Sequence, residues 1–477
     1  MALPVLLVNP NRMQPPVGPI GLDYLADTLR VAGYDVHLLD LCFAASCEEA
    51  IANYFRQNRP QLIGFSIRNT DDCYFASQEC FLGLYREMLA QLRAHSDAPI
   101  VLGGVGFSVM PEAILQRCGG HCGVVGDGEA AIVALADRLA RGESWFDVPG
   151  LVYRDGGRFR RNPPRFGPLD PVPRTRSLID NARYLAEGGM GNVETKRGCS
   201  EHCIYCADPL AKGRHYRLRP PGAVCDELEA LVQQGVDCLH FCDAEFNLPR
   251  AHAEAVCNEI IARGLSERLR WYTYAAAQPF DENLATLMRR AGCQGVNFGV
   301  DSGSDLVLKH LRRSHTVADL HRTAKACRRQ GLTFMFDLLI GGPGETRQTV
   351  RETIDLMKEV SPDRVGASVG VRIYPGTTLA AQVEAAGFRN DNPELYGAVT
   401  GNEDYAEPVY FLSADLGPEA IDYVRELVAG DQRFFIGGKK EDRLQNYNYN
   451  DHSLLLEAIS RGARGAYWDI LRRIQGL

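Results

Sequence analysis

Short apolar runs alternate with segments of helix length over the first 145 residues. The runs cover residues 4–9, 35–40, 61–67 and 99–104, and a shorter one begins at Val124. Strands separated by helices predict right-handed βαβ units and therefore a parallel, doubly wound sheet. Ligands of such sheets bind beyond the carboxyl ends of the strands, so we expect a ligand site on the loops that follow these runs.

The same alternation returns in the middle of the chain. Six strand-like runs, again separated by helix-length segments, predict a partial (β/α)6 barrel with strands at residues 192–195, 236–243, 269–274, 295–301, 333–340 and 364–369. Barrel chemistry takes place at the carboxyl ends of the strands, so the loops after these runs are the second place to look for a site.

A chain of 477 residues is too long for one hydrophobic core. We predict an α/β protein with a doubly wound sheet domain at 1–145, a linker rich in Pro, Arg and Asp at 146–185, the barrel at 186–385 and a small, mostly helical cap at 386–477. The polar run at 446–451 either lines a substrate pocket or, as we favour, forms a surface loop.

The composition restricts the possible partners and compartments. Hydrophobic residues make up 45% of the chain and charged residues 23%, which is ordinary for a soluble protein. The net charge of −8 and the lack of a dense Lys/Arg block argue against nucleic acid. No apolar run approaches a membrane span, and the N-terminus resembles a strand more than an export signal. Fifteen cysteines, an odd number in a long chain, favour a reducing cytoplasm.

Three closely spaced cysteines, Cys199, Cys203 and Cys206, are the strongest chemical signal in the chain. Three thiolates can hold three irons of a [4Fe–4S] cluster and leave the fourth iron open. The alternative is a zinc site in which Cys203 and Cys206 are joined by His202 or His215. The Cys-x3-Cys-x2-Cys spacing, with Tyr205 before the last cysteine, resembles the radical S-adenosylmethionine (SAM) superfamily. In that superfamily the open iron binds SAM, and the reduced cluster cleaves it to a 5′-deoxyadenosyl radical.

Three turns after later strands resemble the SAM-contacting motifs of the same superfamily. Their order after the cysteine loop makes zinc the weaker alternative. The resemblance implies that carboxylates in the first turn take the SAM amino group, that the second turn binds ribose or the amino acid part, and that glycines of the third turn expose backbone groups to adenine. With Tyr205, the implied SAM contacts are Asp243, Glu245, Asp301, Ser302, Gly341, Gly342 and Glu345.

The order of motifs in the first 145 residues resembles the cobalamin-binding domain that precedes the barrel in one branch of the superfamily. The matching stretches are 7–10, 16–25, 101–104 and 126–129. The alternative is a nucleotide-binding or purely structural flavodoxin-like domain. The implied cobalamin contacts are Asn9, Pro16, Gly18, Ser66, Arg68, Asn69, Gly103, Gly104, Gly126, Gly128 and Glu129.

The loop after the first strand lacks the histidine with which many cobalamin proteins bind cobalt from below. We therefore expect Arg68, at the end of the third strand, to cover the lower face of cobalt without donating to it, because a guanidinium has no free lone pair. Pairing of Arg68 with Asp71 or Asp72 is an equally good interpretation. His37 lies inside the second strand and is not expected to bind cobalt.

The run Arg372-Ile373-Tyr374-Pro375-Gly376-Thr377 after the sixth strand also resembles the family. Arg372 and Tyr374 are our candidates for catalytic residues that face the substrate. They are equally good candidates for residues that only close the barrel.

The resemblance implies a cobalamin-dependent radical SAM methyltransferase that acts on an unreactive carbon of a small, natural-product type substrate. It would use a [4Fe–4S] cluster, SAM, cobalamin and an electron donor such as flavodoxin or ferredoxin. The alternatives are oxidative cyclisation or rearrangement with the same cofactors, and polar methyl transfer without an adenosyl radical. A methylthiotransferase would need a second cluster and an RNA-binding tail, and a cobalamin-sensing protein would not need the three cysteines.

Overall fold

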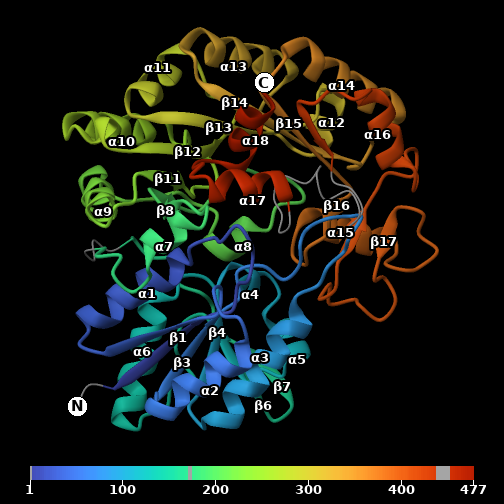
Figure 1. The fold of residues 1–477 in the computed structure, drawn as a ribbon. Coiled ribbons are helices and arrows are strands. Elements are labelled where there is room, and N and C mark those ends of the chain that lie inside the picture. Colours follow the sequence, from blue (N-terminus) through green and yellow to red (C-terminus); the bar gives the residue numbers. More distant parts are fainter. Residues whose placement is uncertain (1–2, 170–173, 437–451, 477) are drawn as a thin grey trace.

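The computed structural model describes residues 3–169, 174–436 and 452–476. The polar run at 446–451 lies outside the described residues. Two α/β units face each other in Figure 1, with the N-terminal sheet in blue and cyan below and a larger curved sheet in green to orange above. The expected α/β class and the order of the two units are confirmed.

The first sheet has the strand order β2-β1-β3-β4-β5-β6-β7. Its first five strands are parallel, as the hydrophobic pattern predicts. They are β1 (Pro4–Asn9), β2 (Asp35–Asp40), β3 (Leu62–Ser66), β4 (Ile100–Gly103) and β5 (Cys122–Val124). The helices between them are α1 (Ile20–Val31), α2 (Cys47–Gln57), α3 (Leu82–His95), α4 (Val105–Val109) and α5 (Pro111–Cys118), and α6 (Glu129–Arg141) follows β5.

Both faces of this sheet are buried, which explains why its strands are almost continuously apolar. On β1, Val5 and Leu7 pack with residues of α1 and α6, whereas Leu6 and Val8 pack with residues of α2, α3 and α5. The side chains of a strand alternate between its two faces, so one apolar run serves two cores.

The predicted linker contributes to this sheet. β6 (Leu151–Asp155) and β7 (Arg158–Arg161) form an antiparallel hairpin that extends the sheet beyond β5. The sheet therefore continues past residue 145, and the crossing between the units is confined to the residues that follow β7. The hydrophobic pattern did not reveal this hairpin, because most of its residues after Val152 are exposed and basic.

The second sheet is parallel and has the order β19-β15-β14-β13-β12-β11-β8. Six of its strands match the predicted runs, and the seventh, β19, comes from the region predicted as a helical cap. The strands are β8 (Gly191–Val193), β11 (Cys238–Phe241), β12 (Arg270–Ala275), β13 (Cys293–Asp301), β14 (Thr333–Ile340), β15 (Arg364–Val369) and β19 (Phe434–Ile436).

Helices cover the outside of this curved sheet (Figure 1). They are α9 (Pro221–Gln233), α10 (Arg250–Ala262), α11 (Glu282–Arg290), α12 (Asp305–His310), α13 (Val317–Gln330), α14 (Arg347–Val360) and α16 (Ala420–Val428). The barrel core includes Trp271 of β12 and also Trp468 of the last helix, α18 (Tyr467–Gln475). The helical C-terminal region, which includes α17 (Ser453–Ser460), is therefore part of the barrel core as well as a cap.

Small elements connect the two units. A short sheet joins β16 (Val371–Arg372) to β17 (Leu395–Gly397) and β18 (Val409–Phe411), next to α15 (Thr378–Ala386). The segment that crosses between the units contains α7 (Asn181–Ala186), and a hairpin of β9 (Lys196–Arg197) and β10 (Arg217–Leu218) frames the cysteine loop and α8 (Asp208–Lys212). Among the described residues, no helix is both long and apolar enough to cross a membrane.

Candidate active site

The three cysteines line one cavity of about 330 Å³ at the carboxyl end of the barrel strands. Their loop begins at Gly198, whose φ of +89° is unfavourable for other residues and whose added Cβ would lie 2.1 Å from the His215 carbonyl oxygen. The Cys199 N–H donates to the Gly213 carbonyl at 3.2 Å, and the Ile204 N–H donates to the Leu311 carbonyl at 3.2 Å. The backbone thus holds the loop at both ends.

Arg313 brings positive charge to the thiols. Its Nη1 donates to Cys203 Sγ at 2.8 Å, and its Nε lies 3.1 Å from Asp301 Oδ2. Burial raises the pKa of Cys203 to about 11, and Arg313 opposes this shift. Tyr205 donates its hydroxyl to Asp301 at 2.6 Å, so Tyr205 and Asp301 belong to the same network as the thiols.

The described residues contain no group of three His, Cys, Asp or Glu side chains close enough to hold a single metal ion. A mononuclear zinc site would need such a group. In a cubic cluster the three cysteines would bind three separate irons, so their sulfurs need not meet at one point.

Asp243 lines the cavity, but barrel residues already use its carboxylate. It accepts bonds from Lys196 Nζ at 2.7 Å and from the Thr195 N–H at 2.8 Å. Although burial opposes ionisation, Lys196 lowers the pKa of Asp243 below its usual range. Asp243 is therefore an ionised partner of Lys196, and its carboxylate is not free for the SAM amino group.

Glu245, two residues further on, has the free carboxylate of this turn. Its Oε2 is buried without a hydrogen-bond partner, and its Oε1 lies 3.9 Å from Arg313. Burial raises the pKa of Glu245 to about 7. A largely buried carboxylate that lines the cavity with one oxygen lacking a hydrogen-bond partner is suited to a cationic ligand.

The other two predicted SAM turns differ from expectation. The Ser302 hydroxyl is fully buried and bonds Thr353 Oγ1 at 3.1 Å, so it faces the helix behind the turn. The N–H groups of Gly341 and Gly342 donate to Glu345 Oε2. The carbonyls of these glycines accept from the Ser413 and Glu345 N–H groups, so their backbone groups bond within the protein, and a contact with adenine stays a prediction. Burial raises the pKa of Glu345 to about 7.

Arg372 and Tyr374 connect the barrel side of the chain to the loop after β3. The Arg372 guanidinium is buried, lies 3.0 Å from Asp71 of the N-terminal unit, and donates to the Tyr405 carbonyl at 3.1 Å. The Tyr374 hydroxyl bonds Cys73 Sγ at 3.1 Å. These contacts brace the loop after β3, which favours the interpretation that Arg372 and Tyr374 close the barrel, and their catalytic role stays a prediction.

That loop leaves Arg68 exposed at the edge of the first sheet. Its Nη1 lies 3.5 Å from Met13 Sδ, and the Asp71 carboxylate is paired with Arg372. Burial lowers the pKa of His240 on β11 to about 4, and the nearby Arg68 guanidinium adds to the effect. Arg68 therefore lies close enough to the barrel to act on His240, and both interpretations of Arg68 stay predictions.

The glycine edge beside Arg68 is partly open. Gly104 is exposed, has φ of +97°, and would place a Cβ 2.5 Å from the Ile67 carbonyl oxygen. Ser66 and Gly103, at the ends of β3 and β4, are half-buried. The Asn69 carbonyl accepts a bond from Tyr85 at 2.9 Å.

The remaining predicted cobalamin residues lie against the barrel. Asn9 is buried and donates to Asp40 at 2.9 Å and to the Tyr184 hydroxyl at 3.0 Å. Glu129 accepts two bonds from Arg197. In the same region lie Gly18, whose carbonyl accepts from Asn192 at 3.0 Å, the buried Pro16, and the turn glycines Gly126 and Gly128.

Sequence reasoning missed several cavity residues because they lie outside the recognised motifs. They are Arg313, Lys212 and Tyr274. Tyr274 is 46% exposed, yet burial raises its pKa to about 12, so its ring faces an internal space. His240 lies beside it, with ring centroids 5.2 Å apart.

Two protein-family models match the chain in the order of its two units. The B12 binding domain model matches residues 12–136, and the Radical SAM superfamily model matches residues 193–357. Tryptophan 2-C-methyltransferase of Streptomyces laurentii is 35% identical over 442 residues, which cover 79% of this chain and 74% of that protein. This chain belongs to the cobalamin-dependent radical SAM methyltransferases. The expected cofactors are thereby confirmed as cobalamin, SAM and a [4Fe–4S] cluster.

Solved structures of this methyltransferase family agree over the whole chain. TsrM from Kitasatospora setae, with tryptophan and the SAM analog aza-SAM bound, is 32% identical, covers 100% of this chain and 99% of its own, and gives a TM-score of 0.91. An uncharacterised methyltransferase of Pyrococcus horikoshii is 28% identical over 76% of this chain and 77% of its own.

The residues present fit the cofactors of the methyltransferase family. Three thiols and the Glu245 carboxylate, whose Oε2 has no hydrogen-bond partner, line one cavity, which suits a three-cysteine cluster and the cationic amino group of SAM. The glycine edge at Gly104 and the exposed Arg68 offer an open surface between the units that a flat corrin can cover.

Proposed function

We propose that the protein transfers a methyl group to a ring carbon of tryptophan or a close indole relative. The observation that supports this substrate class is the aromatic wall of the cavity. Tyr274 faces the internal space with nearly half its surface free, and His240 packs beside it. Aromatic rings favour the edge-to-face and stacked contacts that such side chains offer. Two similar methyltransferases, one named for tryptophan and one with tryptophan bound, support the same substrate.

The residues have separate tasks in this proposal. When bound, methylcobalamin would supply the methyl group, and SAM would supply the methyl group that regenerates methylcobalamin. Cys199, Cys203 and Cys206 hold the cluster, and Glu245 takes the cationic amino group of SAM. Arg68 covers the lower face of the corrin without donating to cobalt.

The compartment and the redox partner are part of the same proposal. The fifteen cysteines are all free thiols, which favours a reducing cytoplasm. A small electron donor such as flavodoxin or ferredoxin would reduce the cofactors there.

Anaerobically reconstituted protein tests the proposal. It is incubated with SAM labelled in the methyl group and with tryptophan, and with phenylalanine in a parallel reaction. We expect labelled methyltryptophan and S-adenosylhomocysteine in equal amounts, and little methylphenylalanine. Failure of the label to reach any indole would refute the substrate class. Equal formation of 5′-deoxyadenosine would indicate the radical route, and its absence the polar route.

Arg68 is tested by the absorption spectrum of bound cobalamin. We expect the spectrum of the Arg68→Ala variant to change to that of a cobalamin with water on its lower face. A spectrum identical to that of the unsubstituted protein would show that Arg68 does not cover cobalt.

A further inference from the structure

The turn after β5 and the cysteine loop belong to different units, yet one arginine joins them directly. Arg197 Nη2 donates to Glu129 Oε1 at 2.7 Å, and Nη1 donates to Glu129 Oε2 at 3.0 Å and to Asp127 Oδ1 at 3.2 Å. Its Nε donates to Glu194 at 2.8 Å. A guanidinium bound in this two-pronged way is fixed in both distance and orientation.

The contact is protected from water. The side chains of Arg197 and Glu129 are only 11% and 18% exposed. Although burial opposes ionisation of Glu129, Arg197 holds its pKa at about 2. On β10, beside Arg197, Arg217 binds the same Asp127, so two neighbouring arginines hold one turn. We call Asp127, Glu129, Glu194, Arg197 and Arg217 the loop clamp.

Arg197 is covalently close to the cysteine loop, so its position affects the position of that loop. Only Gly198 separates Arg197 from Cys199, and at its φ of +89° an added Cβ would lie 2.1 Å from the His215 carbonyl oxygen, so a side chain has no room there. The Cys199 N–H is itself bonded to Gly213. A shift of the guanidinium would therefore move the first cluster ligand.

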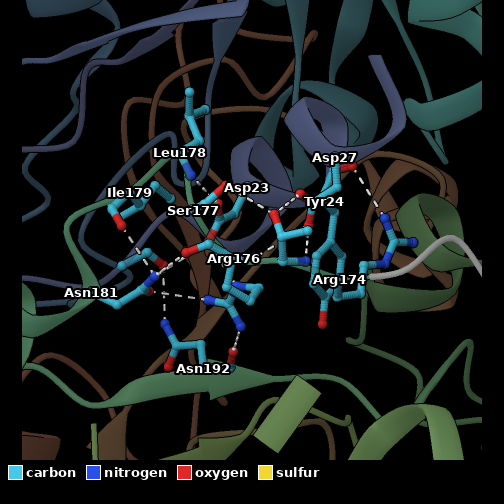
Figure 2. Close-up of polar contacts among 12 residues, drawn as sticks. Asp23, Tyr24, Asp27, Arg174, Arg176, Ser177, Leu178, Ile179, Asn181 and Asn192 are labelled. Carbon is cyan, nitrogen blue, oxygen red and sulfur yellow. Dashed lines mark hydrogen bonds and ion pairs between the residues drawn. The ribbon is translucent and has the colours of Figure 1, made fainter. Parts of the chain in front are cut away.

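A second contact prevents the units from pivoting about the loop clamp. Figure 2 shows Arg176, from the segment between the units, among Asp23 and Tyr24 of α1 and Asn181 and Asn192. Arg176 Nε donates to Asp23 at 2.7 Å, and its Nη1 donates to the Asn192 carbonyl at 2.7 Å. It also bonds Glu227 of α9 at 2.7 Å.

Tyr24 connects the two contacts. Its hydroxyl donates to Glu227 at 2.9 Å. The guanidinium carbons of Arg174, Arg176, Arg197 and Arg219 all lie within 6 Å of its ring centroid, at 4.3, 5.7, 5.8 and 5.7 Å. The loop clamp and the Arg176 network together restrict how one unit can rotate relative to the other, whereas a single contact would allow rotation about it. Buried ion pairs add little net stability, but they form only in a narrow range of geometries. Such a network therefore fixes the relative position of the two units more than it stabilises the fold.

We propose that Arg197 is a positioning residue for methyl transfer, because through Asp127 and Glu129 it sets the separation between the corrin and the iron–sulfur cluster. It touches neither the substrate nor the reacting atoms. The inference rests on the proposed methyl transfer only for its kinetic readout.

The test variant is Arg197→Lys, which keeps the positive charge but cannot form the two parallel hydrogen bonds to Glu129. The control is Arg138→Gln, which removes an arginine paired with Asp147 inside the first unit. In the cofactor-free protein, hydrogen exchange is followed at residues 126–129 and 198–206. We expect faster exchange there in Arg197→Lys, unchanged exchange in β3 and β13, and no change at either place in Arg138→Gln.

Loaded protein gives two further readouts. Iron and corrinoid contents should equal those of the unsubstituted protein, while the magnetic coupling between cob(II)alamin and the reduced cluster changes. The kcat of methyl transfer should fall by about 10- to 100-fold at an unchanged substrate KM, because small misplacements of reacting groups have effects of this size. Glu129→Gln should lower kcat similarly, and the double variant should lower it no further.

Unchanged exchange in the cysteine loop, or unchanged coupling, would overturn the proposal. Loss of iron in step with kcat would also overturn it, since Arg197 would then serve cluster assembly. If Arg197→Lys does not fold, Asp127→Asn replaces it, because this variant removes one of the two carboxylates of the turn. The same readouts then test the proposal. Hydrogen exchange and magnetic coupling need no substrate, so they decide even if tryptophan is not methylated.

Discussion

Asp243 and Glu245 lie on one turn and have opposite electrostatic surroundings. Lys196 overcomes burial and lowers the pKa of Asp243, whereas burial raises the pKa of Glu245 to about 7. Replacing each acid by its amide should therefore change the free energy of unfolding in opposite directions at neutral pH. Comparing the two variants distinguishes the structural carboxylate of Asp243 from the carboxylate of Glu245, which is available to a ligand.

For Glu245→Gln we expect a stabilised cofactor-free protein. An acid whose folded pKa exceeds its unfolded value of 4.5 loses stability as the pH rises from 4.5 to 7, and the loss is constant above that. At about 1.4 kcal/mol for each pH unit, the cost is roughly 1 kcal/mol at pH 5.5 and about 3 kcal/mol at pH 8. Glutamine does not ionise, so the variant should be about 3 kcal/mol more stable at pH 8 and equal to the unsubstituted protein near pH 4. The side chain is only 12% exposed, so solvent screens the effect little.

Asp243→Asn is the matched control. Its folded pKa is lowered, so the stability that it contributes is present above its unfolded pKa of 3.8 and is lost as the pH falls through the folded value. At pH 8 the amide leaves the Lys196 ammonium buried without its carboxylate, which costs about 3–5 kcal/mol.

The assay is urea unfolding of the cofactor-free protein at pH 4, 5.5, 7 and 8. Trp271 and Trp468 belong to the barrel core and report its unfolding by fluorescence, and Trp145→Phe is present in every sample to remove the signal of the first unit. A stability difference between Glu245→Gln and the unsubstituted protein that does not vary with pH would refute the raised pKa of Glu245. Destabilisation by both amides at pH 8 would show that packing, not charge, governs this turn.

Three further predictions concern the cofactor sites and the junction between the units. Gly104→Ala should weaken cobalamin binding at least tenfold in a titration, because the added Cβ would lie 2.5 Å from a backbone carbonyl oxygen. Arg372→Met should lower the free energy of unfolding by about 3–5 kcal/mol in urea, because it leaves the Asp71 carboxylate buried without its partner, and Asp71→Asn in the same background should restore part of that loss. Cys203→Ala should abolish the iron content measured after anaerobic reconstitution, whereas Cys242→Ala, a thiol in the same cavity, should leave it unchanged.

Much of the fold could be predicted because its signals are local. The apolar runs of the first five strands and of six barrel strands are short stretches whose pattern reports burial directly. The hairpin of β6 and β7 was missed because its exposed residues show no apolar periodicity. The strand β19 has only three residues, and it becomes a strand through its pairing with β15.

In the candidate site, too, local motifs could be predicted from the sequence, whereas contacts between distant residues could not. The cysteine spacing and the turn at Asp243 and Glu245 are motifs within a few residues, and the structure brings both to one cavity. The residues assigned a different role from the one expected, such as Glu129, Ser302 and Arg372, have partners far away in sequence. No local pattern reveals such a partner.

The sequence by itself determined two α/β units and a three-cysteine loop, because strand periodicity and ligand spacing depend on neighbouring residues. Only the tertiary structure decided which charges remain available for ligands. Asp71 and Arg372 are 301 positions apart, yet they neutralise each other in the interior. Among the described residues, Glu245 Oε2 has no hydrogen-bond partner, and Arg313 lies 3.9 Å from the other oxygen of the carboxylate. Pairing depends on distance in space, and that distance is set only when the two units pack together.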